Sequence, residues 1–234
     1  MLSDAETLAR VAGDVVVRYV QEAIVTRGRA AVALSGGPTP RRLFELLARP
    51  PHRTRLDFAS IHFFGVDERC VGPEHEQSNF RQANELLFAP AGVPGANVHR
   101  IRGELPPAQA AADYERQLRA FFGDGPPVFD LIHLGVGADG HTASLFADGP
   151  GLDATGEWAV ASRSPIGVAD RVTLTLGVLN VARQVMFFVS GSAKAGIVAR
   201  VFAEAGPASP LPAGRVAPAP GGPLWLLDAA AAAR

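Results

Sequence analysis

The chain has 234 residues, of which 47% are hydrophobic and 19% are charged, and its formal net charge is −1. This composition predicts a folded globular protein, and α/β folds of this length often form a single unit, so we expect one domain over residues 1–234. The balanced charge excludes a general basic surface for nucleic acid, and the single cysteine, Cys70, excludes an intrachain disulfide and any metal site built from several cysteines.

Two features of the sequence bear on its compartment. Residues 1–6 lack the apolar core of a signal peptide, and no run of about 18 apolar residues occurs. We therefore expect a cytoplasmic protein without a membrane-spanning segment.

Apolar residues at three- to four-residue spacing predict helices, and short apolar runs between turn signals predict buried strands. The first helix is expected over residues 4–26, with Asp4 or Ser3 as its N-cap and Gly28 at its end. Thr39 is expected to cap a second helix, with Pro40 in its first position. The elements that follow in the first half are expected as strands over 30–35, 61–66 and 98–101 and helices over 41–48, 79–88 and 106–122.

The second half begins with an apolar strand over 129–136 that runs into a glycine-rich loop. The alternation of strands and helices along the whole chain predicts an α/β fold: a doubly wound, mostly parallel sheet with helices on both faces. The proline-rich stretch 206–223 is expected to be a long loop. The other elements are expected as strands over 158–161, 171–176, 185–190 and 224–227 and as helices over 179–182, from the segment 191–195 to about 204, and after Asp228.

Two strand-to-helix junctions carry the features of an anion site. Ser35-Gly36-Gly37, with Thr39, follows the first strand, and Gly191-Ser192-Ala193-Lys194 follows the strand over 185–190. At such junctions, backbone N–H groups and the positive end of a helix dipole face the same point. We interpret the first as a phosphate-binding turn, with an ordinary capped turn as the alternative. Lys194 alone could be a solvated lysine, but two such junctions in one open sheet can converge on one anion.

Charged residues stand at a third strand end. Asp67-Glu68-Arg69 follows the strand over 61–66, and this position favours a site over a solvated turn. Arg171 begins a later strand and can pair with a phosphate or a carboxylate, although an ordinary edge charge is equally consistent. Cys70 has no histidine partner in view, so we interpret it as incidental.

The loop Gly135-Val136-Gly137-Ala138-Asp139-Gly140-His141 has two interpretations. Its letters match the Gly-x-Gly-x-x-Gly dinucleotide fingerprint, but the loop does not open a first βαβ unit, and Asp139 would repel a pyrophosphate. We favour acid–base chemistry, in which His141 takes a proton from water near neutral pH beside Asp139. A structural histidine is the alternative here, and it is our interpretation of His133, which lies inside the strand run.

Together these segments resemble the 6-phosphogluconolactonase family, in the glucosamine-6-phosphate isomerase/6-phosphogluconolactonase superfamily. The resemblance runs in the right order over nearly the whole chain, and the Asp-Gly-His-Thr-Ala-Ser segment is highly specific in combination with the others. The matching segments are 35–40, Asp67-Glu68-Arg69 with Ser78-Asn79, 135–146, 171–175 with Leu179-Asn180, 191–195 and 224–228.

The resemblance implies hydrolysis of 6-phospho-D-glucono-1,5-lactone to 6-phospho-D-gluconate in the oxidative pentose phosphate pathway, on a Rossmann-like fold of the NagB/RpiA type, with no metal and no organic cofactor. It makes His141 the general base that activates water, Asp139 its orienting partner and Arg69 a group that stabilises the oxyanion. It implies a small sugar-phosphate partner, not nucleic acid or a membrane; we expect a monomer, with a weak homodimer as the alternative. The residues that would hold the substrate are Ser35, Gly36, Gly37, Thr39, Asp67, Arg171 and Lys194.

The sequence departs from the family pattern in two loops: Ala147 stands where proline commonly follows Ser-Leu-Phe, and Gly72 separates Val71 from Pro73. Two other functions remain as alternatives. Glucosamine-6-phosphate deaminases usually have a tyrosine at the position of Arg69 and a glutamate after the histidine, whereas residues 142–146 carry no acid. A non-catalytic sugar-phosphate-binding domain should have lost the histidine or be joined to a DNA-binding segment, whereas this chain keeps His141.

Overall fold

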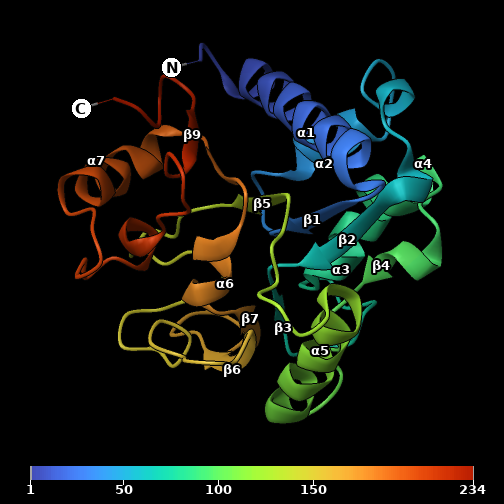
Figure 1. The fold of residues 1–234 in the computed structure, drawn as a ribbon. Coiled ribbons are helices and arrows are strands. Elements are labelled where there is room, and N and C mark those ends of the chain that lie inside the picture. Colours follow the sequence, from blue (N-terminus) through green and yellow to red (C-terminus); the bar gives the residue numbers. More distant parts are fainter. Residues whose placement is uncertain (1, 234) are drawn as a thin grey trace.

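The computed structural model of the protein describes residues 2–233. Its centre is a six-stranded sheet in the order β4-β2-β1-β5-β8-β9, in which all neighbouring strands run parallel (Figure 1). The strand order reverses direction between β1 and β5, which creates a crevice at the carboxyl ends of these two strands. The strands are β1 (Ala30–Leu34), β2 (Ile61–Gly65), β4 (Val98–His99), β5 (Leu131–Leu134), β8 (Val185–Val189) and β9 (Leu224–Leu227).

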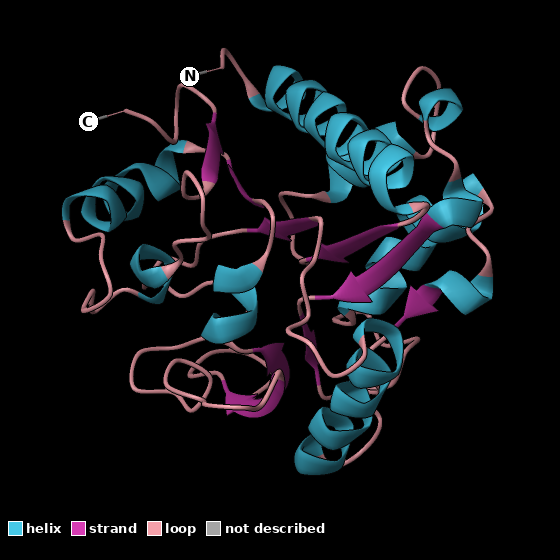
Figure 2. Cartoon of the chain, viewed as in Figure 1, coloured by secondary structure: helices cyan, strands magenta, loops and turns pink. Residues whose placement is uncertain are grey.

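Helices cover both faces of this sheet, as predicted (Figure 2). Every residue of β1, β5 and β8 is buried, which explains why these strands are continuous apolar runs in the sequence. One face packs against α1 (Ala5–Arg27), α2 (Arg41–Leu47), α3 (Asn79–Ala83), a π-helical turn (Asn84–Phe88) and α4 (Ala89–Ala91). The other face packs against α5 (Pro107–Phe122), α6 (Leu176–Val181) and α7 (Ala195–Ala203).

The first helix shows how local sequence signals set an element. The Asp4 side chain caps α1 by accepting a hydrogen bond from the Thr7 N–H at 2.8 Å. Gly28 ends the helix with a φ of 75°, a left-handed conformation that favours glycine. Both ends therefore lie within a residue or two of their predicted positions. No helix in the part of the chain that the structure describes is both long and apolar enough to cross a membrane.

A second, three-stranded antiparallel sheet was not predicted as a separate unit. It contains β3 (Asp67–Arg69), β7 (Asp170–Leu174) and β6 (Ala159–Arg163), in the order β3-β7-β6. Val66 connects the two sheets, because its N–H donates to Leu34 of the central sheet and its carbonyl accepts from Leu174 of β7. The charged triplet, predicted to lie at the end of the preceding strand, is therefore itself a strand, and its register places Arg69 opposite Arg171.

Two local predictions are wrong. Thr39 does not cap α2: Pro40 occupies the N-cap position and no side chain caps this helix. Asp228 is followed by turns instead of a terminal helix. Its carboxylate accepts the Ser190 hydroxyl and the Gly191 N–H, so Asp228 fastens the end of β9 to the turn after β8.

Candidate active site

A cleft with a volume of about 390 Å³ opens at the crevice between the carboxyl ends of β1 and β5. This is the place where open α/β sheets bind ligands, and the volume is in the range of small-molecule sites, roughly 300–1,000 Å³. Asp139 is not part of the cleft wall but contacts a residue that is. The other predicted site residues all line the cleft: Ser35, Gly36, Gly37, Thr39, Asp67, Arg69, His141, Arg171 and Lys194.

His141 lies in the turn after β5, and its side chain is 32% exposed. Its Nδ1 lies 2.5 Å from Oδ1 of Asp139, and the same oxygen accepts the His141 backbone N–H at 3.2 Å. The imidazole also packs against the Phe146 ring, with 4.7 Å between ring centroids. Because Asp139 occupies Nδ1, Nε2 is the nitrogen that can take a proton from water.

Asp139 is held in its charged form. Partial burial raises its pKa, but the backbone hydrogen bond from His141, the charge on His141 and the bond to the imidazole outweigh that effect, so the Asp139 pKa lies below its ordinary value. A charged carboxylate at Nδ1 favours the tautomer with the proton on Nδ1 and leaves the Nε2 lone pair free. This arrangement suits a general base better than a purely structural histidine.

Two positions in this loop require glycine, and one of them lies directly against His141. The Gly137 N–H donates to the His141 carbonyl at 2.8 Å, which closes the turn. A Cβ added at Gly137 would overlap the His141 ring and lie 2.6 Å from Oδ1 of Asp139. Gly140 has a φ of 85° and packs against Leu211. The need for glycine at these two positions follows from the turn and its packing, without reference to a dinucleotide.

Three cations line the cleft, and none of them forms an ion pair within residues 2–233. The Lys194 Nζ donates to the Val136 carbonyl at 2.7 Å, the Arg171 Nε donates to the Val168 carbonyl at 2.8 Å, and an Arg69 Nη donates to the Gln77 carbonyl at 2.6 Å. Burial and then the charge of Arg69 lower the pKa of the Arg171 guanidinium. The cleft therefore holds uncompensated positive charge, which favours an anionic ligand.

The turn predicted to bind phosphate is tightly packed at Gly36 and hydrogen-bonded at Gly37. Gly36 packs directly against the Asn79 side chain, so that an added Cβ would overlap Oδ1 of Asn79. Gly37 has a φ of 103°, but its N–H is not free, because it donates to the Gln82 side chain at 3.0 Å. The Ser35 hydroxyl is buried and has no partner among the described residues. Ser35 therefore offers the cleft a polar group that a ligand can satisfy.

Asp67 lies in the cleft wall with both carboxylate oxygens engaged. Oδ1 accepts from Nδ2 of Asn79 at 3.2 Å, and Oδ2 accepts from the Ser144 hydroxyl at 2.6 Å. Neighbouring Glu68 is buried and faces away from this pair, accepting the backbone N–H groups of Asn79 and Phe80 at the start of α3. Its burial raises the Glu68 pKa, and the backbone hydrogen bonds oppose that rise.

Sequence reasoning assigned no role to Asn79, Ser144 or Phe146. Ser78-Asn79 and the 142–146 segment were part of the family resemblance, which was the available signal. The sequence does not predict that Asn79 and Ser144 bond to the same carboxylate. The two residues are 65 positions apart and follow strands of different sheets. The Phe146 ring stands five residues after His141, beyond a turn whose course the sequence does not predict.

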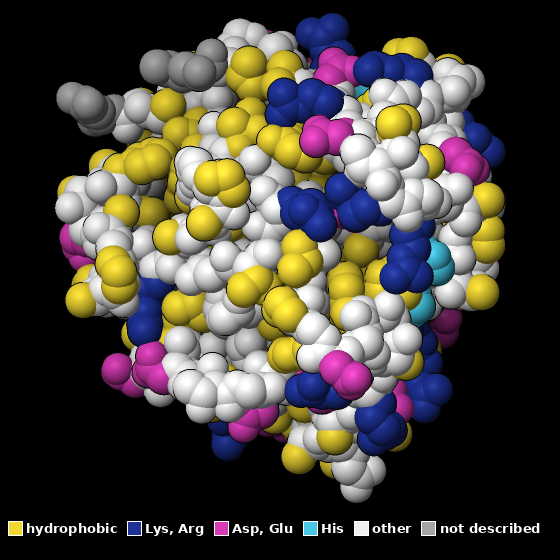
Figure 3. All heavy atoms as spheres, in the orientation of Figure 1, with side chains coloured by type: hydrophobic (Ala, Val, Ile, Leu, Met, Phe, Trp, Pro, Cys, Tyr) yellow, Lys and Arg dark blue, Asp and Glu magenta, His cyan; other side chains and the backbone are white. Residues whose placement is uncertain are grey.

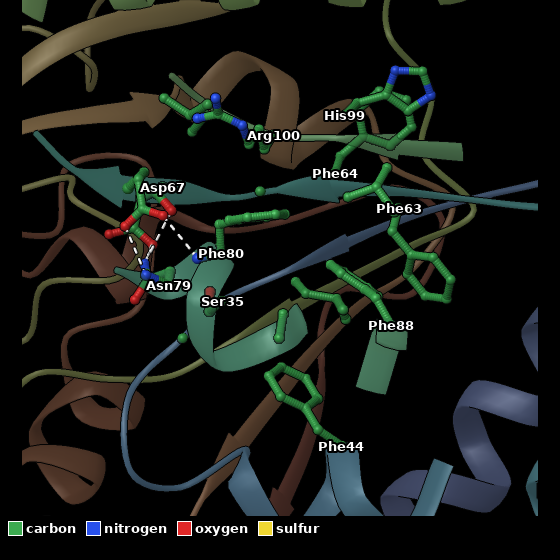
Figure 4. Close-up of a pocket in the computed structure, with 17 residues that line it drawn as sticks. Ser35, Phe44, Phe63, Phe64, Asp67, Asn79, Phe80, Phe88, His99 and Arg100 are labelled. Carbon is green, nitrogen blue, oxygen red and sulfur yellow. Dashed lines mark hydrogen bonds between the residues drawn. The ribbon is translucent and has the colours of Figure 1, made fainter. Parts of the chain in front are cut away.

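A small aromatic cavity of about 30 Å³ lies behind the phosphate-binding turn (Figure 4). Phe44, Phe63, Phe64, Phe88 and His99 surround one end. The wall that it shares with the cleft is formed by Ser35, Gly36, Asp67 and Asn79. Apolar rings therefore lie behind this wall, on the side away from the cleft.

His133 is buried between Phe44 and Phe188, as expected for a packing residue. Its side chain is 1% exposed, neither ring nitrogen has a partner among the described residues, and burial lowers its pKa to about 4. In the unfolded chain His133 is protonated near pH 6.5, whereas in the folded protein it stays neutral down to about pH 4. The free energy of unfolding is therefore unaffected by His133 above pH 6.5 and falls as the pH drops from 6.5 towards 4.

We expect the free energy of unfolding of the wild-type protein to fall by about 2 kcal/mol more than that of His133→Leu between pH 7.5 and pH 5. Urea denaturation of both proteins at the two pH values measures this difference. Equal losses in the two proteins would show that His133 does not carry the effect.

The surface charge agrees with a small local anion site. On the face seen in Figure 3, basic and acidic side chains are interspersed and do not form one field. Within the described residues, no three His, Cys, Asp or Glu side chains are grouped so that they could hold a metal ion. The positive charge at the cleft comes from Arg69, Arg171 and Lys194, and the face seen in Figure 3 adds no basic field to it.

Comparisons with known proteins agree over nearly the whole chain. The family model for glucosamine-6-phosphate isomerases/6-phosphogluconolactonase matches residues 3–225. The chain is 43% identical over 216 residues to 6-phosphogluconolactonase of Homo sapiens, covering 88% of this chain and 81% of the relative. It is 36% identical over 200 residues to 6-phosphogluconolactonase of Haemophilus influenzae, covering 86% and 85%.

Solved structures give the same result. The crystal structure of 6-phosphogluconolactonase from Thermotoga maritima has a TM-score of 0.83 and 31% identity, with 97% of each chain covered. A monomeric glucosamine-6-phosphate deaminase has a TM-score of 0.77 but only 20% identity, so that likeness shows the shared fold alone. Together these findings show that the chain belongs to the glucosamine-6-phosphate isomerase/6-phosphogluconolactonase family.

Proposed function

We propose that this protein is a hydrolase that converts 6-phospho-D-glucono-1,5-lactone to 6-phospho-D-gluconate, the lactone-opening step of the oxidative pentose phosphate pathway. The observation that carries the proposal is one cleft lined by His141, which is paired with Asp139 behind it, and by three cations free of carboxylate partners. A base and an anion site in one small cleft fit a substrate that has a reactive carbonyl and a phosphate. The names of the relatives at 36–43% identity support the same activity.

In the proposed reaction, Nε2 of His141 takes a proton from water as the water oxygen bonds to the lactone carbonyl carbon. The carbonyl oxygen becomes an oxyanion, which the Arg69 guanidinium stabilises. The intermediate then collapses: the bond from this carbon to the ring oxygen breaks, and the proton on His141 passes to the leaving alkoxide. The products are a carboxylic acid, which ionises, and a free hydroxyl, so one water is consumed and His141 is regenerated.

The phosphate is assigned to Ser35, Gly36, Gly37 and Thr39 on one side and to Arg171 and Lys194 on the other. These residues line one cleft, and the unpartnered Ser35 hydroxyl can donate to a phosphate oxygen. Asp67 faces the cleft as a carboxylate and is better suited to substrate hydroxyl groups than to phosphate, because like charges repel.

Removing a phosphate contact should mainly raise KM. We expect Lys194→Ala and Arg171→Ala each to raise KM by about 10- to 100-fold with a smaller effect on kcat, because the phosphate contact is the same in the ground and transition states. Steady-state kinetics measure both constants. Arg163→Ala is the matched control, since it removes an exposed arginine of the same small sheet that does not line the cleft. An unchanged KM in both cleft variants would overturn the assignment.

Deamination of glucosamine 6-phosphate is the second candidate, because the family model covers both activities. Residues 142–146 carry no acid for ring opening, which favours the lactonase. A direct test supplies each substrate to the same enzyme preparation and records acid release from the lactone and ammonia release from the amino sugar. We expect acid release only, and ammonia release at comparable rates would support the second candidate.

The remaining parts of the proposal concern assembly and location. We propose a monomer that acts in the cytoplasm on a small sugar-phosphate lactone. A weak homodimer is the alternative.

A further inference from the structure

Asp67 is the meeting point of two loops that carry different parts of the reaction. Its carboxylate accepts one hydrogen bond from Asn79, at the start of α3, and one from Ser144, three residues after His141. The Asn79 amide also donates to the Asp67 carbonyl oxygen at 3.0 Å. These bonds to Asn79 are among the dashed lines in Figure 4.

Asn79 is in contact with the phosphate-binding turn. Because Nδ2 donates to Asp67, the amide orientation is fixed and Oδ1 faces Gly36, where a Cβ would overlap it. Oδ1 has no hydrogen-bond partner among the described residues although it is buried. Asn79 thus fills the space between Gly36 and Asp67, just beyond the paired ends of β1 and β2.

Ser144 anchors the loop that carries His141. Its neighbour Ala143 has a φ of 52°, a left-handed conformation that is strained for any residue with a side chain. The strained turn is held by the bonds of Ser144: its hydroxyl donates to Asp67, its N–H donates to Thr173 at 3.2 Å and its carbonyl accepts the Ser162 hydroxyl at 2.7 Å. The path of residues 141–144 therefore depends on the position of Asp67, to which the Ser144 hydroxyl is bonded.

We propose that Asn79 and Ser144 are positioning residues that act through the Asp67 carboxylate to set the distance between the phosphate-binding turn at Gly36 and the His141 loop. The inference rests on the proposed function, since the distance matters only if one substrate spans both groups. A phosphate anchored at one end places the lactone carbonyl at a fixed distance from it. A displacement of about 1 Å between catalyst and carbonyl can cost about 100-fold in rate.

The test uses two variants that remove the donors and keep most of the volume. Asn79→Leu is nearly isosteric and removes both bonds to Asp67, and Ser144→Ala removes one hydroxyl. We expect each to lower kcat for 6-phosphogluconolactone by about 10- to 100-fold. Inorganic phosphate, used as an inhibitor that occupies the anion site alone, should bind within about twofold of wild type, and the pH dependence of kcat/KM should be unchanged because the His141–Asp139 contact is intact.

A variant that combines Asn79→Leu and Ser144→Ala distinguishes a common effect through Asp67 from two independent effects on kcat. If both residues act through Asp67, the loss in the double variant will be smaller than the product of the single losses. Thr175→Val is the matched control: it removes a buried hydroxyl that donates to the Glu157 carbonyl at 3.0 Å and does not line the cleft, and it should leave kcat unchanged. Circular dichroism verifies the fold, and Ser144→Ala alone decides the matter if Asn79→Leu does not fold.

Three results would overturn the inference: a kcat near the wild-type value in folded Ser144→Ala, a parallel loss of inorganic phosphate binding, or single losses that multiply in the double variant. A wild-type enzyme that fails to accelerate lactone hydrolysis would contradict the proposed function instead. The wild-type assay therefore distinguishes failure of this inference from failure of the proposed function.

Discussion

Replacing His141 with alanine is expected to lower kcat by about 10²- to 10⁴-fold, which corresponds to about 3–5 kcal/mol of transition-state stabilisation. The reason is that Nε2 of His141 is the group placed to take a proton from water, since Nδ1 is engaged by Asp139 at 2.5 Å. The substrate also hydrolyses spontaneously, so the variant's rate must be measured against a sample without enzyme.

Binding should survive in this variant. The phosphate contacts assigned to Arg171 and Lys194 do not involve the imidazole, so 6-phosphogluconate should bind His141→Ala with an affinity close to that of the wild type. Isothermal titration with the product measures this affinity. Near-wild-type turnover would remove His141 from the mechanism, and loss of product binding together with activity would assign His141 to binding.

Gly137→Ala is expected to impair catalysis almost as strongly, by about 100-fold in kcat, although it adds only one methyl group. The added Cβ would overlap the His141 ring and crowd Asp139 at 2.6 Å, so the imidazole must move from its position beside the carboxylate. The change is steric and local, because Gly137 does not have a positive φ.

Gly135→Ala is the matched control for this prediction. Gly135 belongs to the same loop, its backbone also lacks a positive φ, and an added Cβ would meet no atom within 4 Å. Its kcat should stay within about threefold of wild type. If both alanine variants lose activity equally, the loop needs glycine for flexibility and not for the position of His141.

The sequence predicts the central sheet well, because β1, β5 and β8 are buried on both faces and are therefore continuous apolar runs. It predicts the candidate site residues for the same reason, since polar groups at the ends of such strands converge at one edge. It does not predict the three-stranded sheet: Asp67-Glu68-Arg69 is expected as a site at the end of the preceding strand, with a solvated turn as the alternative, and not as a strand of its own. That sheet depends on pairing with Arg171 and its neighbours, about a hundred residues away in the sequence.

In the C-terminal segment, by contrast, a helix is predicted where the structure has none. The alanines after Asp228 favour a helix by intrinsic propensity, but the Asp228 carboxylate bonds to Ser190 and Gly191, and the chain turns instead. Thr39 also fails as a cap: Pro40 takes the N-cap position and Thr39 lines the cleft. At Asp228 a local signal is overridden by partners that are distant in the sequence.

The most direct test of the central claim is a coupled assay on freshly generated 6-phosphogluconolactone, in which formation of 6-phosphogluconate is followed with and without the wild-type protein. The proposal predicts a rate above spontaneous hydrolysis that rises in proportion to enzyme concentration and is lost in His141→Ala. A rate with enzyme equal to the spontaneous rate would contradict it.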